Sequence, residues 1–273
     1  MADPIDIRVF AQVRRASWGG MVGIKEGLMD VKGPVPQIYT FSGVWLLPVV
    51  LSLIAGSADV TSFLGLGLFS SHVTGNLVIL TAHLVGGRAD NTTLFLSVPI
   101  FILGLALTRL LVAGLEARKI SPLRPLLLLQ FLMLAGAFAV WLALGRPSAP
   151  EARGIIVAGQ LSVAAMAVQH ALVALSLHGS PTTAVMTTNL THFIVHAGDA
   201  LLRHNPEEIA EARHRVRHAW PVILGFIAGA GLGAACFAAA GVKSLALPAG
   251  LALVALAVKP AAGPAGRKPS FSF

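Results

Sequence analysis

The sequence predicts an all-helical protein that is embedded in a membrane. Hydrophobic residues make up 55% of the chain and charged residues only 12%, and the apolar residues are gathered in long runs. A helix that crosses a membrane needs about 20 mainly apolar residues. Backbone N–H and C=O groups inside hydrocarbon must be paired within their own segment, which excludes open strands. We therefore predict membrane helices at residues 44–69, 94–115, 123–144, 154–177, 221–240 and 242–258.

The two ends of the chain contain no long apolar run. Residues 1–41 mix acidic and basic residues, so they predict a cytoplasmic extension and not a cleavable export signal. Residues 261–273 are rich in Gly, Pro and Ala and predict a disordered tail. The transmembrane domain is expected between them, at residues 42–260.

The composition also excludes several classes of function. The net charge of +8 comes from loops that flank the apolar runs, where anionic lipid is the expected partner, so we predict no binding of nucleic acid. The lone Cys236 excludes intramolecular disulfides and Cys-based metal sites. Neither a Gly-x-Ser-x-Gly motif nor a phosphate-binding loop occurs. We therefore expect no enzyme activity and no cofactor.

An internal repeat runs through the predicted transmembrane domain, with copies at about residues 43–145 and 152–259. Each copy has a Thr-x-Asn motif with a His seven residues after the Asn, and the two motifs are 113 residues apart. These residues are Thr74, Gly75, Asn76 and His83 in the first copy and Thr187, Thr188, Asn189 and His196 in the second. Upstream, Asp59 corresponds loosely to Gln169. In each copy the Asn and the His share one face of a helix.

The segment that carries each motif is unusual for a membrane span. Residues 72–86 would form about 22 Å of helix, against a hydrocarbon core of about 30 Å. Residues 182–202 are long enough but rich in Thr and His. We predict six full spans and two short re-entrant half-helices, with eight full spans as the alternative. Interrupted segments at matching places in two halves point to a substrate site between them.

The distribution of Lys and Arg predicts the same orientation for both arrangements. The positive-inside rule places the amino terminus, the loop at residues 203–218 and the carboxyl terminus in the cytoplasm. The rule does not choose between six spans and eight. Three spans in each copy make the repeats inverted, and four make them parallel.

Three adjacent motifs carry a resemblance to a known family. They are Ala55-Gly56-Ser57-Ala58-Asp59, Phe63-Leu64-Gly65-Leu66-Gly67 and His72-Val73-Thr74-Gly75-Asn76. Together they resemble the signature of the YoaK-type bacterial membrane proteins, over roughly residues 42–260. The resemblance implies a multi-pass protein of the bacterial inner membrane with a domain of unknown function, and it implies no particular activity. The second copy departs from the motif, because Thr188 stands where Gly is expected.

Asp59 is the first candidate for a functional residue. A carboxylate inside an apolar run is costly, so it usually faces a partner or a water-filled cavity and often marks the path of an ion. We therefore expect Asp59 to couple the movement of a solute to that of a proton or a small cation. The alternatives are a hydrogen-bonded structural Asp for Asp59 and, for the nearby Arg109, either pairing with Asp59 or snorkelling towards the cytoplasm.

The two Thr-x-Asn motifs are the second candidate. A helix that starts with these residues presents N–H groups that favour a small polar or anionic solute, although the same side chains can also bond helix to helix. We place the site residues at Asp59, His83, Gln169, His196 and the two motifs. The spacing of His192, His196 and Asp199 would suit a metal ion with His83 as an outside ligand, but a chain with nine His produces such spacing by chance, and we expect no metal.

These observations lead to two hypotheses for function. The first is a transporter of a small molecule or ion whose site lies between the two half-helices. The second is a membrane scaffold or sensor that transports nothing and whose polar residues only hold the helices together. Both have the lipid bilayer as a partner and leave open whether the chain forms an oligomer.

Overall fold

The computed structural model describes residues 46–87, 91–144, 153–177, 186–202 and 205–258, which form helices and turns with no strand among them. All of them belong to the unit Ser42–Phe273, which is separate from Met1–Phe41. The extension predicted at residues 1–41 and the tail predicted at 261–273 lie outside the described residues. The prediction of an all-helical fold is confirmed for the part that the structure describes.

Five stretches of the described chain are long and apolar enough to cross a membrane. They are Leu46–Leu66, Thr92–Ala117, Leu123–Ala143, Arg153–Ser176 and Glu207–Ala257. The last of these, at 51 residues, contains more than one helix. The chain therefore has the character of a helical membrane protein.

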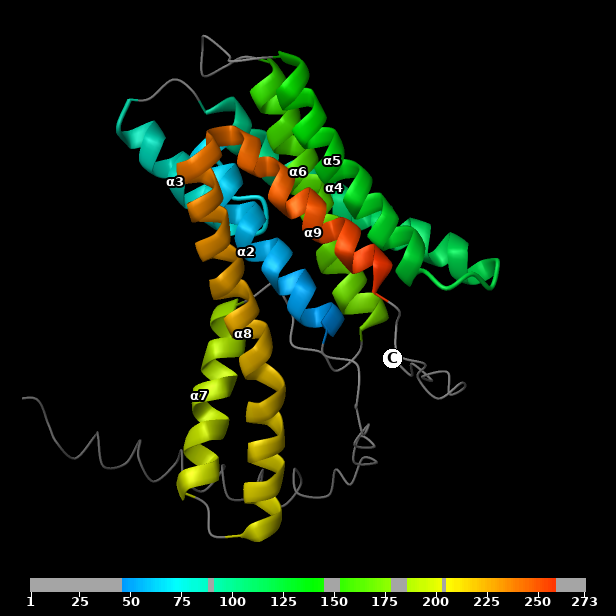
Figure 1. The fold of residues 1–273 in the computed structure, drawn as a ribbon, viewed down its shortest axis with the longest axis vertical. Coiled ribbons are helices and arrows are strands. Elements are labelled where there is room, and N and C mark those ends of the chain that lie inside the picture. The colour runs from blue at the N-terminus through cyan, green and yellow to red at the C-terminus, as the bar shows by residue number, and fades with distance from the viewer. Residues whose placement is uncertain (1–45, 88–90, 145–152, 178–185, 203–204, 259–273) are drawn as a thin grey trace, which may run out of the picture. The chain divides into compact units, whose positions relative to one another are not determined.

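The first half of the described chain forms four helices, coloured blue to green in Figure 1. They are α2 (Leu46–Leu66), α3 (Val73–Val85), α4 (Thr92–Ala117) and α5 (Leu123–Leu144). Because α3 has only 13 residues, it extends about 20 Å and is shorter than the hydrocarbon core.

The second half of the described chain begins at residue 153. It contains α6 (Arg153–Ser176), α7 (Met186–Leu202), α8 (Pro206–Ala240), the short 3₁₀ helix η1 (Gly241–Leu245) and α9 (Ala246–Ala257). The start of α8 is capped by Asn205, whose side-chain oxygen accepts a hydrogen bond from the Glu207 N–H at 3.1 Å. Its end is set by Gly241, which takes a positive φ of 58° that favours glycine.

Glycines bring α2 and α8 into direct backbone contact. Added Cβ atoms at Gly225 and Gly233 would lie 3.0 and 3.1 Å from the carbonyl oxygens of Val49 and Ser57. Gly229 lies even closer to the Leu53 backbone. These contacts advance together along both helices, so α2 and α8 run in the same direction. The small-residue stripe in α8 is therefore a close packing face.

The contacts of α6 fix the directions of its neighbours. Gln160 near the start of α6 donates to the Thr93 carbonyl at 2.9 Å, and Gly104 packs against Ala167, so α4 runs parallel to α6. In the second half of α6, Gln169 donates to the carbonyl of Leu51, near the start of α2, at 2.9 Å. The end of α2 packs instead against the first part of α6. Helix α2 is therefore antiparallel to α6.

Helices α5 and α9 complete an alternating arrangement. Helix α5 is antiparallel to α6, because Gln130 contacts Gln169 while Gly136 lies beside Leu161. Helix α9 is antiparallel to α5, since Arg124 reaches the Leu256 carbonyl at one end and the other ends share an apolar cluster. Helices α2, α5 and α8 thus run one way and α4, α6 and α9 the other (Figure 1). The chain reverses between α2 and α4, where α3 lies, and between α6 and α8, where α7 lies.

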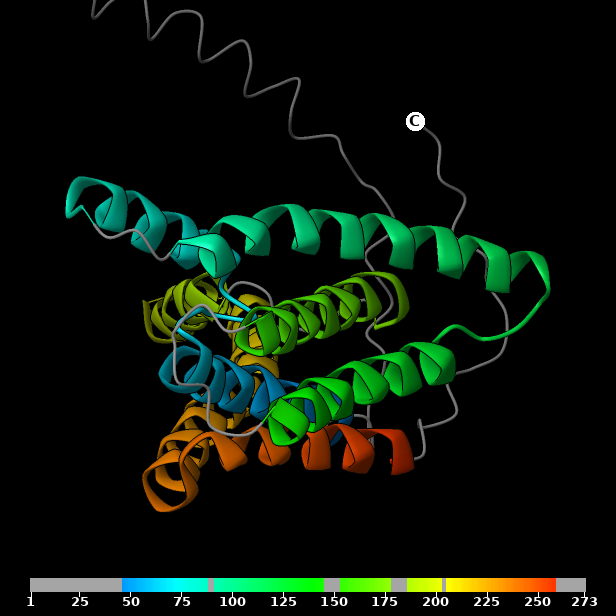
Figure 2. The ribbon, with the colours of Figure 1, turned by 90° about the horizontal axis from the view of Figure 1, so that it is seen from above.

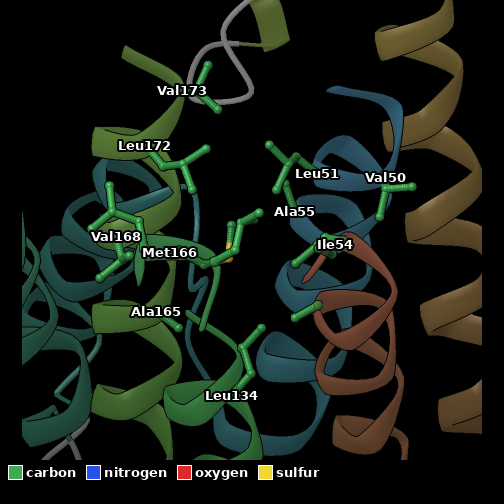
Figure 3. Packing of buried hydrophobic residues seen from close by; sticks show 14 of the residues in the cluster. Val50, Leu51, Ile54, Ala55, Leu134, Ala165, Met166, Val168, Leu172 and Val173 are labelled. Atoms are coloured by element: carbon green, nitrogen blue, oxygen red, sulfur yellow. The ribbon is translucent and has the colours of Figure 1, made fainter. Parts of the chain in front are cut away.

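The main apolar core lies between α2, α5, α6 and α9. Its buried side chains include Leu51 and Ile54 from α2, Leu134 from α5, and Met166 and Leu172 from α6. Figure 3 shows Leu51 of α2 and Leu172 of α6 pointing towards one another across this core. In the view of Figure 2, α4 and α9 lie on opposite sides, with α2 and α6 between them. The candidate site lies on the two central helices.

Candidate functional site

The second half of α2 contains a buried carboxylate, that of Asp59. Asp59 is only 3% exposed, and its neighbours Ala55 and Ala58 are fully buried in the apolar core. An ionised carboxylate in such a place requires partners that donate hydrogen bonds. The chain that follows α2 supplies them.

The connection between α2 and α3 folds back along α2. It turns at Gly67, which has a φ of +75°, and the Phe69 ring then stacks on Phe63 with ring centroids 4.6 Å apart. Asn76, in the first turn of α3, holds this connection in place. Its side-chain oxygen accepts from the Phe69 N–H and its side-chain nitrogen donates to the Phe69 carbonyl, both at 2.7 Å. The fold-back places residues 70–72 beside Asp59.

Three groups from this connection contact the Asp59 carboxylate. One oxygen accepts a hydrogen bond from the Ser71 N–H at 2.6 Å and a longer one from the Ser70 hydroxyl at 3.4 Å. The other oxygen contacts Nδ1 of His72. The carboxylate is therefore paired with an imidazole and held by a backbone amide, so both of its oxygens are in use.

His72 connects this buried acid to the surface of the described chain. Its side chain is 36% exposed, against 5% for that of Asp59. Its ring meets Phe226 of α8 edge-on, with centroids 5.6 Å apart. The hydrogen bond to Asp59 raises the pKa of His72 above the ordinary value of 6.5; burial opposes this change and the negative charge of Asp59 adds to it.

A second histidine joins the group from α6. Nε2 of His170 lies 3.4 Å from the Ser71 hydroxyl, and its ring packs edge-on against Phe101 of α4 at 5.3 Å. His170 is 7% exposed. The site therefore combines Asp59, Ser71 and His72 from the first half of the chain with His170 and Phe226 from the second.

Gln169, the neighbour of His170, belongs to a different set of contacts. It donates to the Leu51 carbonyl and accepts a hydrogen bond from Gln130 of α5 at 2.6 Å. Gln169 and Gln130 are both fully buried. This predicted site residue therefore ties α6 to α2 and α5 within the core.

The first Thr-x-Asn motif lies at the start of α3. Asn76 is buried and clamps the fold-back, Gly75 packs against the Phe69 ring, and Thr74 is exposed. At the far end of α3, Nδ1 of His83 lies 3.0 Å from the side-chain oxygen of Asn91, just before α4. The motif thus shapes the turn that meets Asp59, whereas His83 fixes the turn into α4.

The second motif lies on α7, which packs along α8. Asn189 is buried, whereas Thr187 and Thr188 are exposed. His196 lies 3.8 Å from Asp199 one turn further on. The structure thus places these residues beside α8 and away from the group of side chains around Asp59.

Two alternatives raised by the sequence concern partners for these side chains. Asp59 pairs with His72, while Arg109 is exposed on α4. Among the described residues, no group of three His, Cys, Asp or Glu side chains is placed to hold a metal ion.

Sequence reasoning missed four residues of the group: Ser70, Ser71, His72 and His170. His72 could have been identified from the sequence, because it is the first residue of the motif that contains Asn76. The contact with Asp59 was hidden, because it depends on a backward fold of the connection and not on helical spacing.

Comparison with known proteins identifies the family of the chain. Searches of curated proteins and of solved structures found no match. A family profile described as "Protein of unknown function (DUF1275)" matches residues 47–258, which include all of the helices described above except the first residue of α2. The resemblance to a family of unknown function that the motifs around Asp59 indicated is thereby confirmed. The chain belongs to the DUF1275 family.

Proposed function

We propose that this protein is a transporter of a small polar or anionic solute in the bacterial inner membrane. The observation that carries this proposal is the buried Asp59 carboxylate, which meets the start of a short helix at the junction of both halves of the chain. Intramembrane acids with such partners commonly serve ion or solute pathways. Short or interrupted helices near the middle of the membrane commonly form the substrate site.

Six crossings with two half-helices suit this arrangement best, with η1 and α9 (Gly241–Leu245 and Ala246–Ala257) together forming the sixth crossing. Helix α4 runs opposite to α2, so α3 between them begins and ends on the same side of the bundle. The start of α3 lies beside Asp59, more than one turn inside the end of α2. This supports a half-helix that dips into the membrane. Helix α7 also lies between two helices of opposite direction, α6 and α8, and packs along α8.

The packing of the helices supports two inverted repeats. Let α2, α3, α4 and α5 correspond in order to α6, α7, α8 and α9. The contact of α2 with α8 then corresponds to the contact of α6 with α4. The pair of α5 with α6 becomes that of α9 with α2, and α3 with α4 becomes α7 with α8; all of these pairs are in contact. Equivalent helices such as α2 and α6 run in opposite directions. Inverted repeats of this kind underlie alternating access in many transporters.

The charges on α8 support a cytoplasmic location for its first part. Arg213, Arg217 and Trp220 share one face of the helix, followed by the exposed Leu224. Basic residues favour the cytoplasmic side, and Trp favours the membrane interface. The first residue of α2 and the last of α9 lie at this same side, so both termini are proposed to be cytoplasmic.

The chemistry of the site favours a polar solute. His72 offers an exposed imidazole edge, and the start of α3 beside it offers the positive end of a helix dipole. Phe226 and Phe101 supply apolar walls around the two histidines. A solute with a carboxylate or carbonyl group fits these partners.

Uptake into proteoliposomes tests the proposal. Purified protein would be reconstituted and offered pooled radiolabelled carboxylates, amino acids and inorganic anions, with Asp59→Asn as the comparison and protein-free liposomes as the control. We expect accumulation of at least one solute by the natural protein and its loss in the variant. Correctly folded protein that moves none of these solutes would favour the scaffold or sensor hypothesis.

A further inference from the structure

The group around Asp59 contains three acid–base residues, Asp59, His72 and His170, of which Asp59 and His72 are in direct contact. We infer that the coupling ion is a proton and that Nε2 of His72 binds and releases it, while Asp59 positions the ring. This inference rests on the proposed transport function and names its coupling ion.

The geometry of Asp59 argues against a metal cation such as sodium. Hard cations are bound by several oxygen ligands at once. One oxygen of Asp59 faces the Ser71 N–H and the Ser70 hydroxyl, and the other faces His72. All three neighbours present hydrogen-bond donors to the carboxylate. The carboxylate therefore offers no free oxygen around which a cation shell could form.

The same contacts determine which nitrogen of His72 exchanges protons. The carboxylate is an acceptor, so Nδ1 of His72 carries a hydrogen and donates it. In the neutral ring, Nε2 then holds a lone pair, and binding of one proton there produces the imidazolium ion without breaking another bond. Asp59 stabilises that cation, in the way that a carboxylate orients and supports many functional histidines.

Exposure assigns the exchange to His72 and not to Asp59. The His72 side chain is 36% exposed, whereas the Asp59 side chain behind it is 5% exposed. A proton that arrives from water meets the imidazole first. The buried acid can serve as a fixed counter-charge throughout the cycle.

The ring also lies where its charge can influence both halves of the protein. The His72 ring contacts Asp59 of α2 and the ring of Phe226 of α8. The hydroxyl of the preceding residue, Ser71, contacts His170 of α6. The titratable groups around the His72 ring are thus Asp59 and, one hydrogen bond further, His170. A proton on Nε2 strengthens the pairing with Asp59 and changes the contact with Phe226. If two conformations differ in these contacts, protonation shifts the balance between them.

Nuclear magnetic resonance of the full chain in lipid nanodiscs, with ¹⁵N-labelled histidine, tests the proton site without any solute. His72→Gln identifies the His72 signals, and His214→Gln, at an exposed position of α8, serves as the control. We expect His72 to hold its hydrogen on Nδ1 when neutral and to gain a proton on Nε2 as the pH falls. In Asp59→Asn the midpoint of this titration should move to lower pH by about 1–3 units. A neutral ring with the hydrogen on Nε2, or a midpoint unchanged in Asp59→Asn, would overturn the inference.

Transport with a defined driving force tests the coupling. In proteoliposomes that carry the solute found in the uptake screen, a pH gradient should drive accumulation by the natural protein, and a sodium gradient should not. His72→Gln should lose the pH-driven accumulation and keep counterflow exchange, which also shows that the variant is folded. Accumulation driven by sodium alone would refute the choice of ion. If no solute is transported at all, the proposed function fails, and the magnetic resonance result still decides whether His72 is the proton-binding residue.

Discussion

Replacing Gly229 by Ala should separate α2 from α8 and destabilise the protein. A Cβ atom at this position would stand 2.8 Å from Cα and 2.9 Å from the carbonyl carbon of Leu53. These are backbone atoms, which cannot rotate away as a flexible side chain would, so the two helices must move apart. Overpacking of this kind costs about 1–3 kcal/mol, and we expect the upper end of that range.

Gly231 offers a matched control in the same helix, because a Cβ atom there would meet nothing within 4 Å. Gly231→Ala should therefore be neutral or slightly stabilising, since Ala is the better helix former by about 1 kcal/mol. Thermal unfolding in detergent, followed by circular dichroism at one scan rate, measures the difference. About 3 kcal/mol corresponds to an apparent Tm lower by about 6–12 °C in a chain of this size. Equal Tm values for the two variants would refute the close packing of α2 on α8.

Three further predictions concern the site and its place in the membrane. Asn76→Ala removes two hydrogen bonds to Phe69, so it should lower stability by about 1–3 kcal/mol, as measured by thermal unfolding, and Asn76→Asp, which sets a buried carboxylate oxygen against the Phe69 carbonyl, should lower it at least as much. In a Cys236→Ala background, Arg118→Cys should react with a thiol reagent only from the cytoplasmic side and Lys243→Cys only from the outside; an outward Arg118→Cys would support eight spans. Because the hydrogen bond to Asp59 raises the pKa of His72, the ring keeps its proton to higher pH, so proton-driven uptake by the natural protein, measured as initial rates over a series of pH values, should fall only above that raised pKa.

The helices could be predicted from the sequence because their cause is local. Long apolar runs can only be helices in hydrocarbon, so the runs at residues 94–115 and 123–144 match α4 and α5 closely. Helix α8 was expected from residue 221 but begins at Pro206, because the polar stretch before it continues the same helix. Hydropathy marks only the apolar part of this helix, whereas its charged first part is indicated by the four-residue spacing of Glu211 and Arg215, which form an ion pair.

Asp59 could be found from the sequence, but its partner could not. The cost of burying a carboxylate marks Asp59 as a residue that must be paired. The choice of partner depends on the turn at Gly67 and on the Asn76 clamp, which together bring residues 70–72 back along α2. Gln169 illustrates the opposite case. The loose match of Gln169 to Asp59 predicted that Gln169 is a site residue. In the structure its side chain bonds to Leu51 and Gln130, and these bonds depend on the packing of three helices.

The two copies of the motif differ at one position, and the structure gives that difference a physical meaning. In the first copy, a side chain at Gly75 would begin 3.1 Å from the Phe69 ring, tighter than ordinary van der Waals contact. Glycine therefore lets the ring and the folded-back connection lie against the start of α3, which places His72 on Asp59. The second copy has Thr188 at the matching position, so its half-helix cannot accept an aromatic ring in the same close contact. We therefore expect a proton-binding pair beside the motif with Gly75 and none beside the motif with Thr188.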